Sequence, residues 1–306
     1  MKNPGSKLVS TFALAVAALS AAPLAAQDTA TAPAAGETQD DGIIVTGLRR
    51  EESLQDTPAA VTAFDSRAIE NAGIERPADF IALTPNVTLV ETQNAGNAFV
   101  IIRGITQNRN SEPSVAVIVD GVQQVNPAQF NQDLFDIEQI EVLKGPQGGL
   151  YGRNAIGGAI IITTKKPTDE FSGNVTAGID NGFGYFLRGG ISGPLADNVF
   201  FRVAGSYYDT DGFIPNTFLG EDADPVKDYS LRANLLVEAT DRLTIDLRGS
   251  MNRLRTQGLY YNIVGDVNTV ADVEVNNPGQ NDRDIYNVAL KVEFEGDNAT
   301  FTSISS

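Results

Sequence analysis

The chain has 306 residues, the length of about two soluble domains, and it carries a net charge of −17. This acidity argues against a nucleic-acid partner. Cysteine and histidine are both absent, which excludes disulfides, thiol nucleophiles, Cys/His zinc sites and histidine acid–base catalysis. An enzyme would have to work with carboxylates, lysine, tyrosine or serine alone. We predict no catalytic residue, no metal site and no resident cofactor.

Residues 1–26 have the features of an export signal. Lys2 and Lys7 precede an apolar core at 8–22, and small residues after it offer a cleavage site. The alternative, an uncleaved membrane anchor, is disfavoured because this core is too short to span a bilayer comfortably. Residues 27–42 lack large apolar side chains, so we expect a disordered tether there.

A short β-prone patch interrupts this polar sequence. It consists of Ile43, Ile44, Val45, Thr46 and Gly47. Such a patch cannot fold alone, and spacing leaves two alternatives open. It is either the first strand of the following domain or a linear motif that adds as a strand to the sheet edge of a partner.

The chain up to residue 167 predicts a small α+β domain. Asp65 or Ser66 can cap a helix that Gly73 ends. A second helix is expected at 75–83, entered through a proline. The β-branched runs predict strands at 87–90, 98–103 and 115–119, with a turn at 120–121.

The stretch at 136–167 reads DIEQIEVLKGPQGGLYGRNAIGGAIIITTKKP and closes this domain. Alternating apolar residues predict one strand at its start, and the β-branched run at 160–164 predicts a strand buried on both faces. The glycines between them permit positive φ and close backbone approach, so we expect tight turns there.

From residue 171 the pattern becomes strict two-residue alternation. It predicts strands at 171–179, 183–191, 199–207, 229–237, 243–251 and 286–294, with a seventh beginning near 300. Segments of about 9–11 residues match a tilted transmembrane strand.

The connections distinguish a membrane barrel from a soluble β-sandwich, which also alternates. The joins near residues 195, 240 and 297 are short, whereas those at 209–228 and 253–284 are long and polar. Short periplasmic turns with long outer loops are typical of an outer-membrane barrel. Because a closed bacterial barrel needs an even number of strands, seven indicate an incomplete barrel and a fragment of a longer protein.

The order of these segments resembles the TonB-dependent outer-membrane receptors. The motifs at 102–105 (IRGI) and 119–122 (VDGV), and above all the stretch from Ile140 to Pro167, are similar to the plug signatures of that family. The patch at 43–47 is similar to its TonB box, which favours the linear motif over a first strand.

The resemblance implies a division into a signal peptide (1–26), a tether (27–42), a TonB box (43–50), an α+β plug (51–167) and antiparallel transmembrane β-barrel strands (168–306). It also implies a mechanism. Ligand binding on the outer side releases the box, which then pairs with TonB, energised by the inner-membrane ExbB–ExbD complex. The expected location is the bacterial outer membrane, with the strands in contact with lipid.

The family commonly places an arginine at each of two plug positions that face barrel glutamates. Arg103 matches the first, and Lys144 stands at the second as a point charge without a bidentate fork. We predict that both lock the plug to the barrel. Six polar side chains in the apical turns are predicted to contact ligand: Asn94, Asn97, Gln107, Asn108, Arg109 and Gln124.

The predicted function is active uptake of a small polar ligand, with a ferric siderophore preferred from family frequency and a cobalamin or a glycan as alternatives. A passive porin or adhesin is a second class, which the plug and the box disfavour. An enzyme is a third class. The motif GPQGGLYGR lacks the Lys-Ser/Thr of a phosphate loop, and no acidic residue suits a dinucleotide fingerprint.

Overall fold

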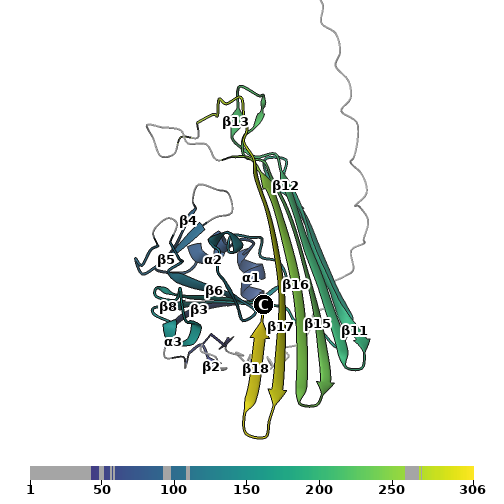
Figure 1. The fold of residues 1–306 in the computed structure, drawn as a ribbon. Helices are drawn as coiled ribbons and strands as arrows, with labels where there is room; N and C mark the ends of the chain where they lie inside the picture. Colours follow the sequence, from purple (N-terminus) through teal and green to yellow (C-terminus); the bar gives the residue numbers. More distant parts are fainter. Residues whose placement is uncertain are drawn as a thin grey trace, which may run out of the picture. The chain divides into compact units, whose positions relative to one another are not determined.

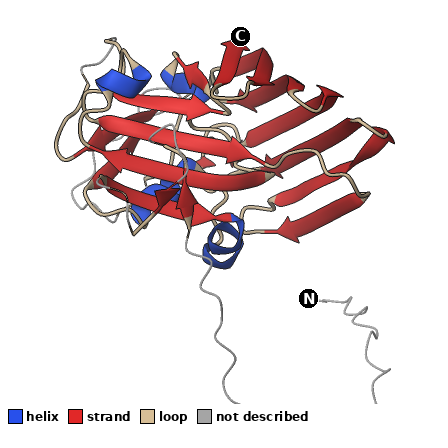
Figure 2. Cartoon of the chain, turned by 90° about the horizontal axis from the view of Figure 1, so that it is seen from below, coloured by secondary structure: helices blue, strands red, loops and turns tan. Residues whose placement is uncertain are grey.

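The computed structural model describes residues 43–47, 52–55, 57, 59–91, 98–107, 111–258, 269 and 271–306. The predicted signal peptide and tether lie outside this part of the chain. Strands make up most of the described chain, and its helices are short (Figure 2). Among the described residues, no helix is long and apolar enough to cross a membrane.

Short strands and helices alternate in the N-terminal part, here called the small domain. Its elements are β1 Ile44–Val45, β2 Glu52–Ser53, β3 Ala60–Asp65, α1 Ser66–Ala72, α2 Pro77–Ala82, β4 Val87–Glu91, β5 Ala98–Ile102, β6 Val115–Val119, β7 Val122–Gln124, the 3-10 helix η1 Pro127–Gln129, β8 Ile137–Lys144, α3 Gly148–Tyr151 and β9 Gly158–Thr164. Helix α1 is confirmed with its caps. The Asp65 carboxylate accepts from Ala68 N at 2.7 Å, and Gly73 adopts φ 62°.

A five-stranded sheet in the order β3-β8-β9-β6-β7 forms the centre of the small domain. Strands β6 and β9 are parallel, and the other neighbours are antiparallel. Alternate residues of the central strands point to opposite faces, so each face carries its own apolar cluster. The larger cluster includes α1, α2 and the residues Ile140, Val142, Ile160 and Ile162. The smaller one consists of Ala116, Ile118, Leu143, Ala155, Ala159 and Ile161.

The sequence predicted only tight turns between β8 and β9, but this connection also contains a short helix. Residues 148–151 form a one-turn helix, α3. Glycine is a poor helix former, which is why the glycine run predicted only turns. At Gly158 glycine is required, because φ is +156° and a Cβ there would lie 2.3 Å from the Leu143 carbonyl oxygen.

Seven antiparallel strands, here called the wall, follow the small domain (Figure 1). They are β10 Ser172–Ile179, β11 Tyr185–Ala196, β12 Val199–Thr210, β15 Val226–Thr240, β16 Leu243–Thr256, β17 Asn281–Glu295 and β18 Thr300–Ser305. Each pairs with the next one along this series. The predicted strands and their antiparallel arrangement are confirmed, and several strands extend beyond the predicted ends.

The two faces of the wall differ in polarity. Exposed apolar side chains on one face include Leu187, Val203, Leu231, Leu247 and Val288. Buried polar side chains on the other include Arg202, Ser206, Ser230, Asp246 and Asn252. An apolar outer face with a polar inner face is the pattern of a transmembrane barrel.

The two long connections of the wall were predicted as plain loops, and this was incomplete. The first contains a small hairpin of β13 Pro215–Asn216 and β14 Glu221–Asp222. The second contacts it, since Thr217 N donates to Val273 O and Val273 N donates to Pro215 O, both at 2.8 Å. These two-residue strands depend on contacts between segments far apart in sequence, which local pattern does not encode.

Candidate functional site

The β-prone patch, residues 43–47, contains the two-residue strand β1 and is held against the rest of the small domain; we call it the docked segment. Its central residues pair antiparallel with β2, in the register Ile44↔Ser53 and Val45↔Glu52. The Val45 side chain is 1% exposed, whereas Ile44 is 49% exposed. The segment therefore buries one side chain of the pair and leaves the other in solvent.

One carboxylate holds the end of the docked segment. Oε1 of Glu141 accepts from Thr46 N and from Thr46 Oγ1, both at 2.9 Å. Oε2 accepts from Gly47 N at 2.8 Å. Glu141 lies in β8 and is 1% exposed, so both of its oxygens are satisfied within the protein.

Two further side chains bind main-chain carbonyls of the docked segment. The Tyr151 hydroxyl, from α3, donates to Gly47 O at 2.7 Å. Gln139 Nε2, from β8, donates to Ile44 O at 2.8 Å. Tyr151 and Gln139 both belong to the stretch 136–167. The sequence predicted two strands and tight turns in this stretch, but it did not predict a contact with residues 43–47.

Arginines on the inner face of the wall bind carboxylates of the small domain. Arg188 on β11 contacts Glu75 at 2.7 Å and Asp133 at 2.8 Å. Arg202 on β12 binds Asp136 through two hydrogen bonds, and the two side chains are 9% and 8% exposed. The Arg188–Asp133 and Arg202–Asp136 pairs are bidentate and largely removed from solvent, which is the geometry that the arginine fork favours.

The next two strands also carry arginines that contact the small domain, one through a main-chain carbonyl and a ring and the other through a carboxylate. Arg232 on β15 donates to Phe135 O at 2.8 Å and lies 4.5 Å from the centre of the Phe135 ring. Arg248 on β16 contacts Asp120 at 2.7 Å and its strand neighbour Asp246 at 2.6 Å. Together Arg188, Arg202, Arg232 and Arg248 form what we call the arginine seam.

Sequence reasoning missed the arginine seam. The available signal was a charged residue in a transmembrane strand, which should face the lumen and find a partner there.

The two predicted lock residues lie near each other on the small domain. Lys144 Nζ donates to Thr62 Oγ1 at 2.9 Å, and Arg103 is exposed with φ 51°. Burial first, and then the nearby Arg103 guanidinium, lower the pKa of Lys144. Their predicted pairing with barrel glutamates stays a prediction.

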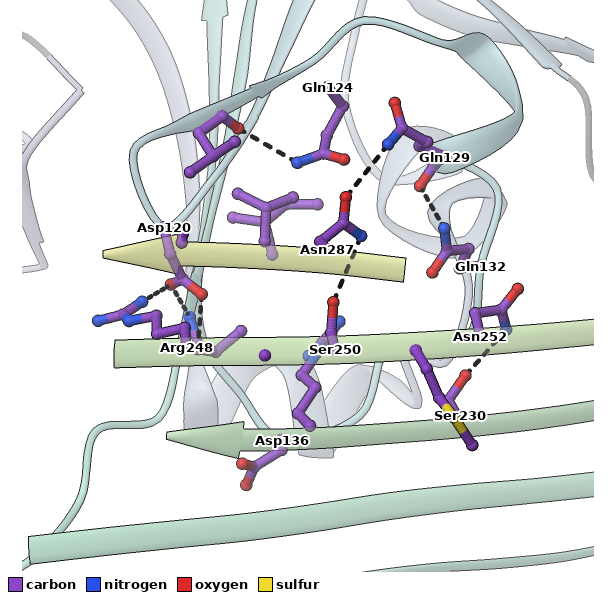
Figure 3. A pocket seen from close by; sticks show the side chains of 18 of the residues that line it. Asp120, Gln124, Gln129, Gln132, Asp136, Ser230, Arg248, Ser250, Asn252 and Asn287 are labelled. Atoms are coloured by element: carbon purple, nitrogen blue, oxygen red, sulfur yellow. Dashed lines mark hydrogen bonds and ion pairs between the residues drawn. The ribbon is translucent and has the colours of Figure 1, made fainter. Parts of the chain in front are cut away.

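A cavity of about 380 Å³ lies between residues 117–136 and strands β15 to β17. Amides and hydroxyls line much of it (Figure 3). Gln129 Nε2 donates to Asn287 Oδ1, and Asn287 Nδ2 donates to Ser250 Oγ, both at 3.3 Å. Arg248 in this lining is already paired with Asp120. Apolar side chains, among them Val119, Phe130 and Ile162, share the lining with these amides and hydroxyls.

Two of the predicted ligand residues can be placed. Gln124 lines the large cavity, and with Gln107 it also lines a second, smaller hollow. The structure thus brings these two side chains together. The other four, Asn94, Asn97, Asn108 and Arg109, lie outside the described residues.

Comparison with known proteins matches both parts of the chain. The family profile described as "TonB-dependent Receptor Plug Domain" matches residues 53–159. The vitamin B12 transporter BtuB of Photobacterium profundum is 26% identical over 86% of this chain and 42% of its own length. The ferrioxamine B receptor of Salmonella typhimurium is 28% identical over 76% of this chain and 32% of its own length.

The fold also matches solved structures. The ferric yersiniabactin uptake receptor FyuA from Yersinia pestis superposes with a TM-score of 0.71 and 23% identity, over 78% of this chain and 39% of that one. The match therefore extends from the small domain into the wall. The chain spans less than half the length of the curated relatives it matches.

Proposed function

We propose that the protein actively takes up a scarce ligand across the outer membrane, because its sequence and fold resemble the plug domain and barrel strands of a TonB-dependent outer-membrane receptor. The docked segment carries the proposal. It is a short strand held by hydrogen bonds at the start of the plug, and such a strand can add to the sheet edge of another protein. In this role it is the TonB box, on which TonB pulls with energy from the ExbB–ExbD complex.

The proposed organisation follows the sequence. Residues 1–26 direct export, 27–42 tether the box at 43–50, 51–167 form the plug, and 168–306 lie in the lipid of the outer membrane. The apolar outer face of the wall supports this placement. The protein transports its ligand without catalysing a reaction on it.

For the ligand we propose a ferric siderophore. The ferrioxamine B receptor, aligned over 76% of the chain, supports this class, since ferrioxamine B is an iron–siderophore complex. A cobalamin is the second candidate, supported by the vitamin B12 transporter aligned over 86% of the chain. Gln107 and Gln124, with Asn94, Asn97, Asn108 and Arg109, are the proposed ligand contacts.

Collapse of the proton gradient tests active transport. Cells expressing the receptor are given a panel of radiolabelled ferric siderophores and cobalamin, with and without a protonophore, under iron-limited and iron-replete growth. Energised uptake predicts that accumulation of one ligand stops with the protonophore while surface binding persists. Accumulation that continues unchanged would instead identify a passive pore.

A further inference from the structure

The docked segment covers the smaller apolar face of the plug sheet. A Cβ added to Gly47 would lie 2.6 Å from Leu143 Cδ1 and 3.3 Å from Ile161 Cδ1, and both of these side chains belong to the smaller cluster. Val45 is almost fully buried in the same segment. A larger residue at position 47 would displace these terminal side-chain atoms.

Glu141 is an acid in an otherwise apolar place. Its neighbours Ile140 and Val142 point into the larger cluster, whereas Glu141 shares its face with Leu143. A buried carboxylate is strongly unfavourable unless hydrogen bonds satisfy both oxygens. Here the donors are Thr46 N, Thr46 Oγ1 and Gly47 N, so the docked segment and the carboxylate satisfy one another.

We propose that Glu141 is a positioning residue that latches the TonB box to the plug and sets how often the box is released. The inference rests on the proposed function, because the released segment is what TonB would bind. Charge-assisted hydrogen bonds give the docked state its advantage. Release opens the face to water, which hydrates the carboxylate, so the latch is reversible.

The docked state also prevents TonB from binding the end of the docked segment. In the docked state the N–H of Gly47 is bound to Glu141 and its carbonyl oxygen is bound to the Tyr151 hydroxyl. Strand addition uses the same main-chain groups. TonB and the latch therefore compete for this end of the box, and weakening the latch should expose the box without any ligand.

Thiol labelling measures the release directly. The chain has no cysteine of its own, and Val45 is 1% exposed, so Val45→Cys gives a reporter that reacts with a maleimide only when the segment leaves. The receptor is labelled in outer-membrane vesicles without TonB or a proton gradient. In this background we compare Glu141→Gln with Glu138→Gln, an exposed acid on the same strand.

The latch predicts that Glu141→Gln raises the labelling rate about tenfold, because the variant amide presents a donor where Gly47 N–H needs an acceptor. Tyr151→Phe should raise it about threefold through the loss of one neutral hydrogen bond, and Glu138→Gln should leave it unchanged. Circular dichroism checks that each variant is folded. Equal labelling of folded Glu141→Gln and its parent would overturn the latch. Uptake that continues after the proton gradient is collapsed would overturn the proposed function. It would not affect the conclusion drawn from the labelling rates.

Discussion

Ion pairs of the plug and the wall fall into two classes by burial. The Arg202–Asp136 pair is removed from solvent on both sides, with side chains 9% and 8% exposed. The Arg242–Asp297 pair, at 2.7 Å, joins side chains that are 57% and 75% exposed. Solvent screens the second pair, so it should contribute little. Loss of one partner from the first pair leaves an unpaired buried charge.

Replacement of Asp136 by Asn should therefore destabilise the receptor far more than replacement of Arg242 by Gln. We expect a loss of about 3–5 kcal/mol in the free energy of unfolding for Asp136→Asn and less than about 1 kcal/mol for Arg242→Gln. Asp136 has φ 60°, a conformation that Asn also tolerates, so the comparison isolates the charge. Denaturant unfolding in detergent, followed by circular dichroism, measures both. Equal losses would show that burial does not set the strength of these pairs.

The helices and strands that the sequence predicted best are those that depend on residues close together in the chain. Helix α1 was predictable because its Asp65 cap and its Gly73 terminator are local. The wall strands were predictable because one face is apolar and the other is polar, so the sequence alternates along each strand. Helix α3 and the β13–β14 hairpin were not, because the first is glycine-rich and the second depends on contacts with Val273.

The turn between β8 and β9 offers a test at this scale. Gly158→Ala would place a Cβ 2.3 Å from a main-chain oxygen, which cannot move without shifting β8. We expect a loss of about 1–3 kcal/mol in the free energy of unfolding. The matched control is Gly149→Ala, where a Cβ meets no atom within 4 Å and should be neutral or slightly stabilising. The same unfolding measurement applies, and a neutral Gly158→Ala would refute the close approach.

In the molecule as a whole, contacts between distant segments make the site, and these were the hardest to predict. The docked segment was visible as a β-prone patch in a polar tether. The role of Glu141 was not visible, because Glu141 lies 95 residues from Thr46 and resembles any outward-facing acid in an alternating strand. The arginine seam likewise connects four wall strands, from β11 to β16, to loops of the plug. The alternating pattern shows that these arginines face inward, but it does not indicate which plug residues they contact.

Uptake by a Val45→Pro receptor tests the central claim most directly. Proline removes the N–H at the centre of the box and breaks strand pairing, while the proposed ligand contacts lie elsewhere. Val45→Ala is the control, because it keeps the N–H and loses only side-chain packing. We predict that Val45→Pro binds ligand at the cell surface but accumulates none, and that Val45→Ala still transports. Normal accumulation by folded Val45→Pro would contradict energised transport through this segment.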